Sequence, residues 1–210
     1  MLRIRPRIGA YAGLAALGVW TSLYVVSAVL HGSYSIVDNY LSDLGHPQAA
    51  GNWAFNAACI FGGLLFIPYG LAVGPALGSR LGGAGSALII AAGFALFLVG
   101  VFPEESPNDL HFLVSLAFFI LLTLSAAVLA VPLLMTPSFG RLAGYLAGAA
   151  VAGSAAFLVS GGSKLLEHVA VYTGLVWALW TAIRLGSAAS APRPISPAPS
   201  AAPGHGPPVP

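Results

Sequence analysis

The chain has 210 residues, of which 58% are hydrophobic and 7% are charged. A soluble domain carries about a quarter charged residues, so this composition excludes a soluble protein and makes the lipid bilayer the expected partner. The formal net charge of +2 comes from arginines beside apolar runs, and no nucleic-acid partner is expected.

Six apolar runs follow one another along the chain, and each is long enough to cross a bilayer. A span needs about 20 mostly apolar residues, and a continuous run without strand-like alternation predicts a helix. The sequence therefore predicts an all-α, polytopic membrane domain over residues 1–186, a six-helix bundle of three hairpins. The first run follows several arginines as in a signal peptide, but its length and the five later runs favour an uncleaved helix. The predicted spans are 9–31, 52–73, 83–102, 111–133, 141–160 and 168–186.

The last part of the chain, residues 187–210, has a different composition. It consists largely of Ala, Ser and Pro. Such a segment cannot bury enough apolar surface to fold, so it is predicted to be a disordered cytoplasmic tail.

The charged residues are sorted between the two ends of the predicted helices. Seven of the eight basic residues lie at one end, and all the acidic residues and four of the five histidines lie at the other. Because basic residues are retained on the cytoplasmic side, this predicts a multi-pass protein of the cell membrane with both termini in the cytoplasm. The acidic residues, on the outer side, are Asp38, Asp43, Glu104, Glu105, Asp109 and Glu167.

The first outer segment joins the first two predicted helices. Apolar residues recur at helical spacing from Ile36 to Leu44, which predicts a short amphipathic helix in the membrane interface. Asn39 and Asp43 would share one face of that helix, and Asp43 lies three residues before His46.

Further polar side chains stand where later helices begin. Asn52 and Asn56 share a face of the second helix, and Asn56 lies about one turn into the lipid, where its amide needs partners. Asn108 or Asp109 would cap the fourth helix. On that helix His111 and Ser115 share a face, while Glu167 and His168 open the sixth helix.

Two interpretations of the outer polar residues stay open. In the first, the acids cap helices and the other polar groups contact water, lipid or a membrane-protein partner, so the protein is structural or accessory. A polar pocket without metal would be formed in that case by Ser42, Asn52, Asn56 and Ser115.

In the second interpretation the outer end holds a metal. His46, His111, His168 and Asp43 would converge on zinc with an open coordination position, since three imidazoles and one carboxylate are a sensible ligand set. The zinc would activate water for hydrolysis of a lipid or amide substrate. The candidate catalytic residues are Asp43, Glu104 and Glu167.

Other classes of function are less favoured. No ionisable Asp, Glu, Lys, Arg or His lies at the middle of a predicted span, which argues against ion-coupled transport. Cys59, the single cysteine, is expected to have a packing role. Gly144 and Gly148 have GxxxG spacing, which predicts packing within the bundle and leaves a homo-oligomer open.

Three short motifs occur in order along the chain: Ser42-Asp43-Leu44-Gly45, Trp53-Ala54-Phe55-Asn56, and Gly100-Val101-Phe102-Pro103-Glu104, the last followed by His111. With these motifs the sequence resembles, over residues 9–186, the prokaryotic membrane family catalogued as domain of unknown function 998. The resemblance implies six membrane helices and no settled activity.

More distantly, the sequence is similar to membrane hydrolases related to alkaline ceramidases and progestin/adiponectin-receptor proteins. Those proteins place Ser, Asp and three His around zinc at one membrane face. This chain departs from them, with six spans instead of the typical seven and without their HxxxH pair. The residues that the likeness would match are Ser42, Asp43, His46, His111 and His168.

Overall fold

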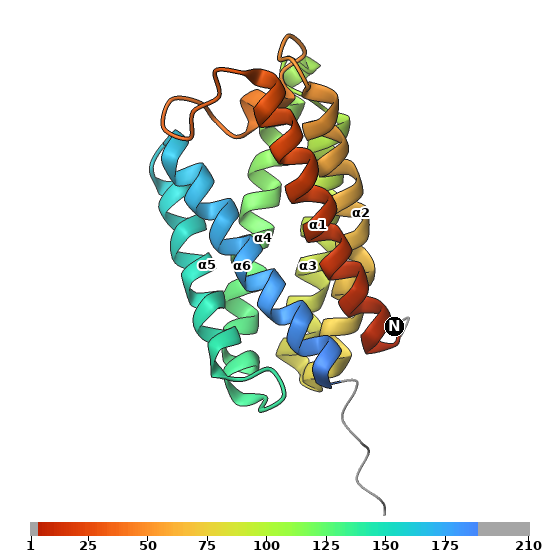
Figure 1. The fold of residues 1–210 in the computed structure, drawn as a ribbon. Helices are drawn as coiled ribbons and strands as arrows, with labels where there is room; N and C mark the ends of the chain where they lie inside the picture. The colour runs from red at the N-terminus through yellow and green to blue at the C-terminus, as the bar shows by residue number, and fades with distance from the viewer. Residues whose placement is uncertain (1–3, 189–210) are drawn as a thin grey trace, which may run out of the picture.

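A computed structural model describes residues 4–188 (Figure 1). Six long helices in this part of the chain are long and apolar enough to cross a membrane, which confirms the predicted all-α, six-span fold. The remaining residues of the predicted tail lie outside the described range. The long helices are α1 (Pro6–His31), α2 (Asn52–Leu77), α3 (Arg80–Val101), α4 (Leu110–Met135), α5 (Arg141–Val159) and α6 (Lys164–Ala188). Two short 3-10 helices are η1 (Ser42–Gly45) and η2 (Pro107–Asp109).

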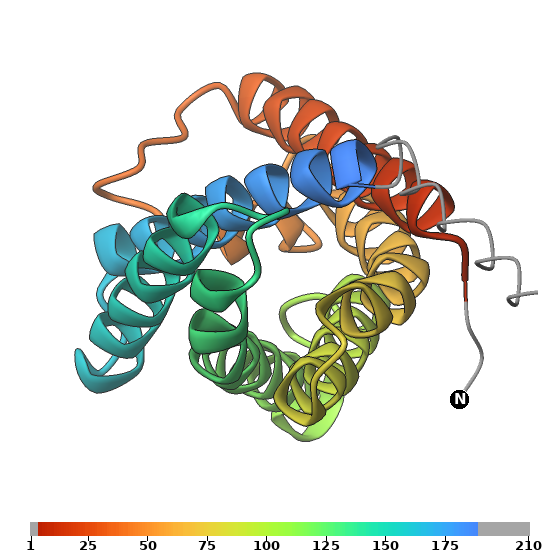
Figure 2. The ribbon, with the colours of Figure 1, turned by 90° about the horizontal axis from the view of Figure 1, so that it is seen from below.

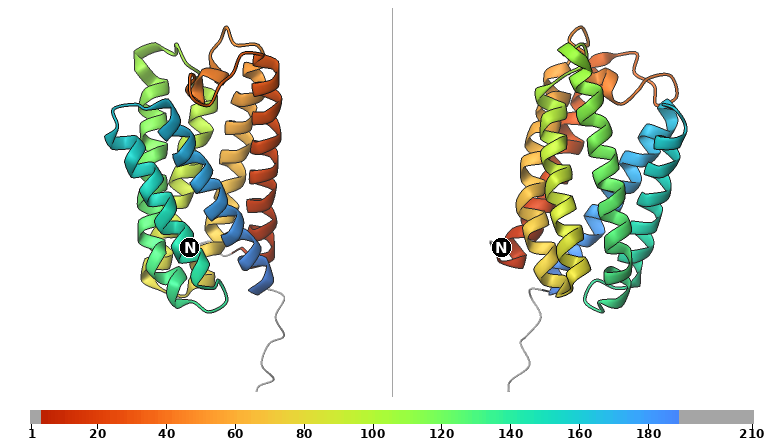
Figure 3. Two further views of the ribbon diagram at one scale, coloured as in Figure 1. Left: turned by 60° about the vertical axis from the view of Figure 1, so that its left-hand side comes forward. Right: turned by 180° about the vertical axis from the view of Figure 1, so that it is seen from behind.

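The helices form a ring in chain order, best seen along its axis (Figure 2). Each helix packs against the next one, and α1 closes the ring against α6. The helices α1 and α6 meet closely at the end where the described chain begins and finishes, and they diverge toward the other end (Figure 1). A loop between α1 and α2 spans that gap (Figure 3).

The two ends of the ring differ in charge. All six acidic residues lie at the end that carries the α1–α2, α3–α4 and α5–α6 connections, which we call the acidic end. The other end, which we call the arginine end, carries the α2–α3 and α4–α5 connections. Its described basic residues are Arg5, Arg7, Arg80, Arg141 and Arg184.

Small residues let α2 and α3 pack with their backbones in contact. A Cβ on Gly63 would lie 2.4 Å from the carbonyl oxygen of Gly93, and one on Gly100 would lie 2.4 Å from that of Asn56. Further along, the Ser86 hydroxyl of α3 donates to the Gly70 carbonyl and accepts from the backbone N–H of Gly74 at 3.1 Å. Such contacts replace the hydrophobic driving force that helices lack in lipid.

The GxxxG pair of α5 is divided between two directions. Gly144 faces α4, where an added Cβ would lie 2.3 Å from Leu134, whereas nothing in the described part of the chain lies within 4 Å of a Cβ on Gly148. Gly144 therefore serves packing within the bundle, and Gly148 faces outward.

The predicted amphipathic helix over 36–44 is wrong. The segment forms a turn followed by η1, with Ile36 and Val37 exposed and Leu44 completely buried. Carboxylates take up two of its backbone N–H groups: that of Tyr40 donates to Asp43 Oδ2 at 2.9 Å and that of Leu41 to Glu167 Oε2, in place of bonds along a helix. Tertiary contacts thus override the local apolar spacing.

Candidate functional site

The α1–α2 connection, residues 32–51, covers the acidic end of the ring, and we call it the cover loop. Its most buried tie to α6 is a hydrogen bond from the backbone N–H of Leu41 to Glu167 Oε2 at 2.6 Å. Glu167 is 6% exposed and Leu41 is 5% exposed. The predicted catalytic candidate Glu167 therefore holds the loop to the bundle.

A second tie joins Tyr34 of the cover loop to His168. The Tyr34 hydroxyl contacts His168 Nε2, and His168 Nδ1 lies 2.8 Å from the carbonyl oxygen of Lys164. A carbonyl can only accept, so Nδ1 carries a proton, and in the neutral imidazole Nε2 accepts from Tyr34. Burial, with nearby tyrosines, raises the pKa of the Tyr34 phenol well above its usual value, which keeps it protonated as a donor.

Two further hydrogen bonds, one partly buried and one exposed, join the cover loop to the region where α6 begins. The Tyr40 hydroxyl donates to the carbonyl of Gly162 at 2.6 Å, and Lys164 Nζ donates to the carbonyl of Asp38 at 2.5 Å. The ammonium of Lys164 also lies 5.4 Å from the centre of the Tyr40 ring. These contacts fasten the cover loop to the beginning of α6.

An aromatic cluster joins α1 and α6 beneath the cover loop. The hydroxyls of Tyr24 on α1 and Tyr172 on α6 are 2.7 Å apart, and Trp20 stacks on Tyr24. Tyr34 meets Tyr24 edge-on. Tyr24 and Tyr172 were not among the predicted site residues, and the signal that could have found them is a tyrosine near the outer end of a span.

Below η1 the ring encloses a central cavity of about 80 Å³. Five of the six long helices line it, with α5 excepted, and its walls are almost entirely apolar. On α4 the lining runs from Ser115 to Ser125, so the cavity is about 15 Å long at 1.5 Å per residue. Ser42, Ser115 and Glu167 line the acidic end of the cavity, and Tyr69 and Ser125, whose hydroxyls donate to backbone carbonyls, line it deeper in the bundle.

A separate, open outer pocket of about 230 Å³ lies on the other side of η1. It brings together three predicted residues, Asp43, His46 and Glu104, and adds His31. Ser42 faces the central cavity and Asp43 the outer pocket, so η1 divides the two spaces.

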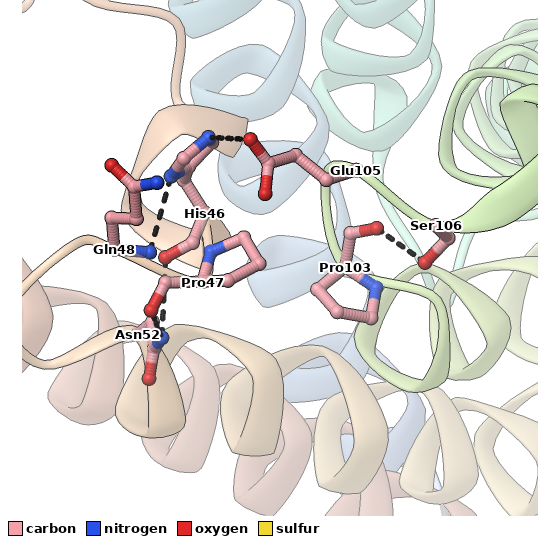
Figure 4. Close-up of polar contacts among 7 residues, drawn as sticks. All are labelled: His46, Pro47, Gln48, Asn52, Pro103, Glu105 and Ser106. Carbon is pink, nitrogen blue, oxygen red and sulfur yellow. Dashed lines mark hydrogen bonds and ion pairs between the residues drawn. The ribbon is translucent and has the colours of Figure 1, made fainter.

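His46 is tied to its neighbours at the rim of this pocket (Figure 4). Its Nε2 lies 3.2 Å from Glu105 Oε1, and its Nδ1 accepts from the backbone N–H of Gln48 at 3.2 Å. Both ring nitrogens are therefore engaged, and His46 joins the cover loop to the α3–α4 connection. Since both side chains are partly exposed, this pair contributes little to stability.

The predicted zinc ligands are not assembled into one site. Within residues 4–188, no group of three or more His, Cys, Asp or Glu side chains is placed to hold a metal ion. His111 instead places Nδ1 2.8 Å from the Phe102 carbonyl and Nε2 3.4 Å from the Ser115 hydroxyl. Like His168, it makes its hydrogen bonds near the beginning of its helix.

The predicted amides also anchor the cover loop. Asn52 Nδ2 donates to the carbonyl of Pro47 at 2.8 Å, and Asn56 Nδ2 donates to that of Gly45 at 3.4 Å. The buried Oδ1 of Asn56 has no hydrogen-bond partner among the described residues. A Cβ on Gly45 would lie 2.7 Å from that oxygen and 2.8 Å from the Phe55 ring, so a larger residue there would force these side chains to move.

The predicted cap of α4 is only partly as expected. Asp109 occupies the N-cap position, but its side chain makes no capping hydrogen bond within the described part of the chain. Asn108 and Asp109 both have left-handed backbone conformations, with φ of 58° and 53°. Neither geometry presents the carboxylate or amide to the first turn.

Comparison with known proteins gives one match. The model of the family described as "Protein of unknown function (DUF998)" matches residues 14–184. Neither the curated proteins nor the solved structures contain a match to the chain. The matched range includes the cover loop and every residue that lines the central cavity and the outer pocket.

Proposed function

Because the chain belongs to the DUF998 family, as its motifs predicted, and the family description states no activity, we propose a function from the geometry alone. The protein binds one single-chain amphiphile of the membrane, with the hydrocarbon chain in the central cavity and the head group beneath the cover loop. The observation that carries this proposal is an apolar cavity with Ser42, Ser115 and Glu167 at its acidic end.

The length of the cavity suits a chain from one leaflet. About 15 Å is half of the roughly 30 Å hydrocarbon thickness of a bilayer. A volume of about 80 Å³ is small for that length, so even one extended chain fits only if lining side chains move apart, and a ring system or a two-chain lipid fits less well still.

The cavity also has an energetic reason to be filled. Protein interiors are close-packed, and an unfilled cavity of 80 Å³ costs roughly 2 kcal/mol at about 24 cal/mol per Å³. A hydrocarbon chain that fills the space regains those contacts, because the walls are mostly apolar.

The polar end defines the kind of head group. The hydroxyls of Ser42 and Ser115 can donate or accept, and the Glu167 carboxyl offers acceptor oxygens, so a head group that donates hydrogen bonds is favoured. Since Leu41 and Ser42 line the cavity and belong to the cover loop, a head group at that end would contact the loop.

The proposal includes an orientation in the cell membrane. With the arginine end in the cytoplasm, the cover loop and central cavity lie in the outer half of the bilayer. The amphiphile then comes from the outer leaflet. A zinc-dependent hydrolase has less support, because its predicted ligands are not brought together.

A brominated fatty alcohol tests the proposal, because bromine quenches tryptophan fluorescence at short range and Trp20 and Trp177 line the cavity. The variant Gly174→Leu fills the cavity, which Gly174 also lines. Gly18→Leu is the matched control, since nothing in the described part of the chain lies within 4 Å of a Cβ there.

We expect saturable quenching in the natural protein and in Gly18→Leu, and loss of the saturable component in Gly174→Leu. Mass spectrometry of the purified protein should also find a co-purified single-chain amphiphile that Gly174→Leu lacks. Equal saturable quenching in all three proteins would refute a cavity site.

A further inference from the structure

A third concave surface lies at the arginine end, between the beginning of α1 and the end of α6. It is an open groove of about 730 Å³. The α1 side contributes Arg7, Tyr11 and Leu14, and the α6 side contributes Ile183 and Ser187. We call it the basal groove, and it is separate from the central cavity in position and lining.

The floor of the basal groove is made of small residues. A Cβ on Gly186 would lie 3.4 Å from the Cβ of Ala10, so α1 and α6 touch there without large side chains between them. One turn further into the bundle, a Cβ on Gly13 would lie 3.2 Å from the Cβ of Ala182. The two helices therefore touch at the floor of the groove, and the groove is open above that contact.

The lining changes in character along the helix axis. Arg7 stands in the first turn of α1, and Leu14 lies about 10 Å deeper in the membrane, seven residues on. Tyr11, which is 69% exposed, lies between them, at a depth that suits an amphipathic ring. Charge at the surface, an aromatic ring below it and aliphatic side chains deeper follow the order of head group and acyl chain in a phospholipid.

The charge of this end selects the kind of phospholipid. The described residues of the arginine end include five arginines, and all six acidic residues lie at the opposite end of the ring. Arg7 is the charged residue among those that line the groove, and a basic side chain in a pocket between membrane helices attracts acidic head groups. We propose that the basal groove binds one acidic phospholipid, with its phosphate at Arg7 and an acyl chain along Leu14 and Ile183.

This site is independent of the proposed amphiphile site, since it has another ligand and lies at the other end. The test uses the full chain in detergent micelles with equal amounts of phosphatidylglycerol and phosphatidylcholine, and native mass spectrometry counts the lipids retained. Arg7→Gln removes the proposed phosphate contact. Arg141→Gln is the matched control, because Arg141 is an exposed arginine at the start of α5, outside the groove.

We expect the natural protein and Arg141→Gln to retain one phosphatidylglycerol in preference to phosphatidylcholine. Arg7→Gln should lower that retention about fivefold, the factor expected for one basic residue near a membrane surface. Equal losses in the two variants would show diffuse attraction and overturn the site, as would full retention in Arg7→Gln. Inorganic phosphate should not displace the lipid, and displacement would indicate a free-phosphate site instead.

Discussion

The bond from the Leu41 backbone N–H to Glu167 predicts how firmly the cover loop is held. The change to make is Glu167→Leu, which removes the acceptor and leaves a buried N–H without a partner. Glu167→Gln keeps an acceptor oxygen in nearly the same volume. Glu105→Gln is the control, because that carboxylate is mostly exposed, at 58%.

The magnitude follows from burial and hydrogen-bond chemistry. A buried N–H that is left without a partner costs about 1–3 kcal/mol. Taking about 2 kcal/mol for local opening, the amides of residues 41–45 should exchange with deuterium about 30-fold faster in Glu167→Leu. Glu167→Gln should lose less than half of that free energy, because a neutral acceptor remains.

Hydrogen–deuterium exchange with mass spectrometry measures this opening peptide by peptide. Global melting is a poor readout, because removing a buried carboxyl also relieves its desolvation cost. Exchange over 41–45 should accelerate in Glu167→Leu and stay at the natural rate in Glu105→Gln. Unchanged protection in Glu167→Leu would refute the idea that Glu167 holds the cover loop.

Three further predictions concern packing, topology and ionisation. Gly63→Ala should lower the melting temperature by several degrees, because its Cβ would meet the neighbouring backbone. Gly18→Ala should leave the melting temperature unchanged, and equal melting temperatures of the two variants would contradict this. The thiol of Ser33→Cys should react with an impermeant reagent added outside cells, and that of Ser138→Cys should not. The reverse result would show that the proposed orientation is inverted. Because the pKa of Tyr34 is raised, Tyr34→Phe should leave the phenolate absorbance step near pH 10 unchanged, and a smaller step would contradict that direction.

The six spans could be predicted because lipid makes the length of an apolar run the decisive signal. Which face of each helix points inward could not be predicted in the same way. In a soluble helix a polar face marks the outside, but here both faces are apolar, as with the exposed Phe94 and the buried Ile89 of α3. The inward faces of the helices line the central cavity, so the cavity could not be predicted from the sequence.

The candidate site shows a similar division. Local pairs such as His111 and Ser115, four residues apart on one helix, could be predicted and lie together. The ties of the cover loop could not, because Tyr34 and His168 are 134 positions apart and only the closed ring brings them together. The predicted zinc ligands also come from segments that are far apart in the sequence. Their residue types suit a metal, but the fold does not bring them together.

The closure of the ring also has a consequence for biosynthesis. The cover loop is held by a residue 126 positions later in the chain, at the start of the last helix. At roughly 5–20 residues per second, a ribosome needs about 6–25 s to add that stretch. Throughout that interval the loop lacks its partner and the interior of the bundle stays open to the bilayer. An amphiphile can thus enter during synthesis, before the loop is fastened to α6.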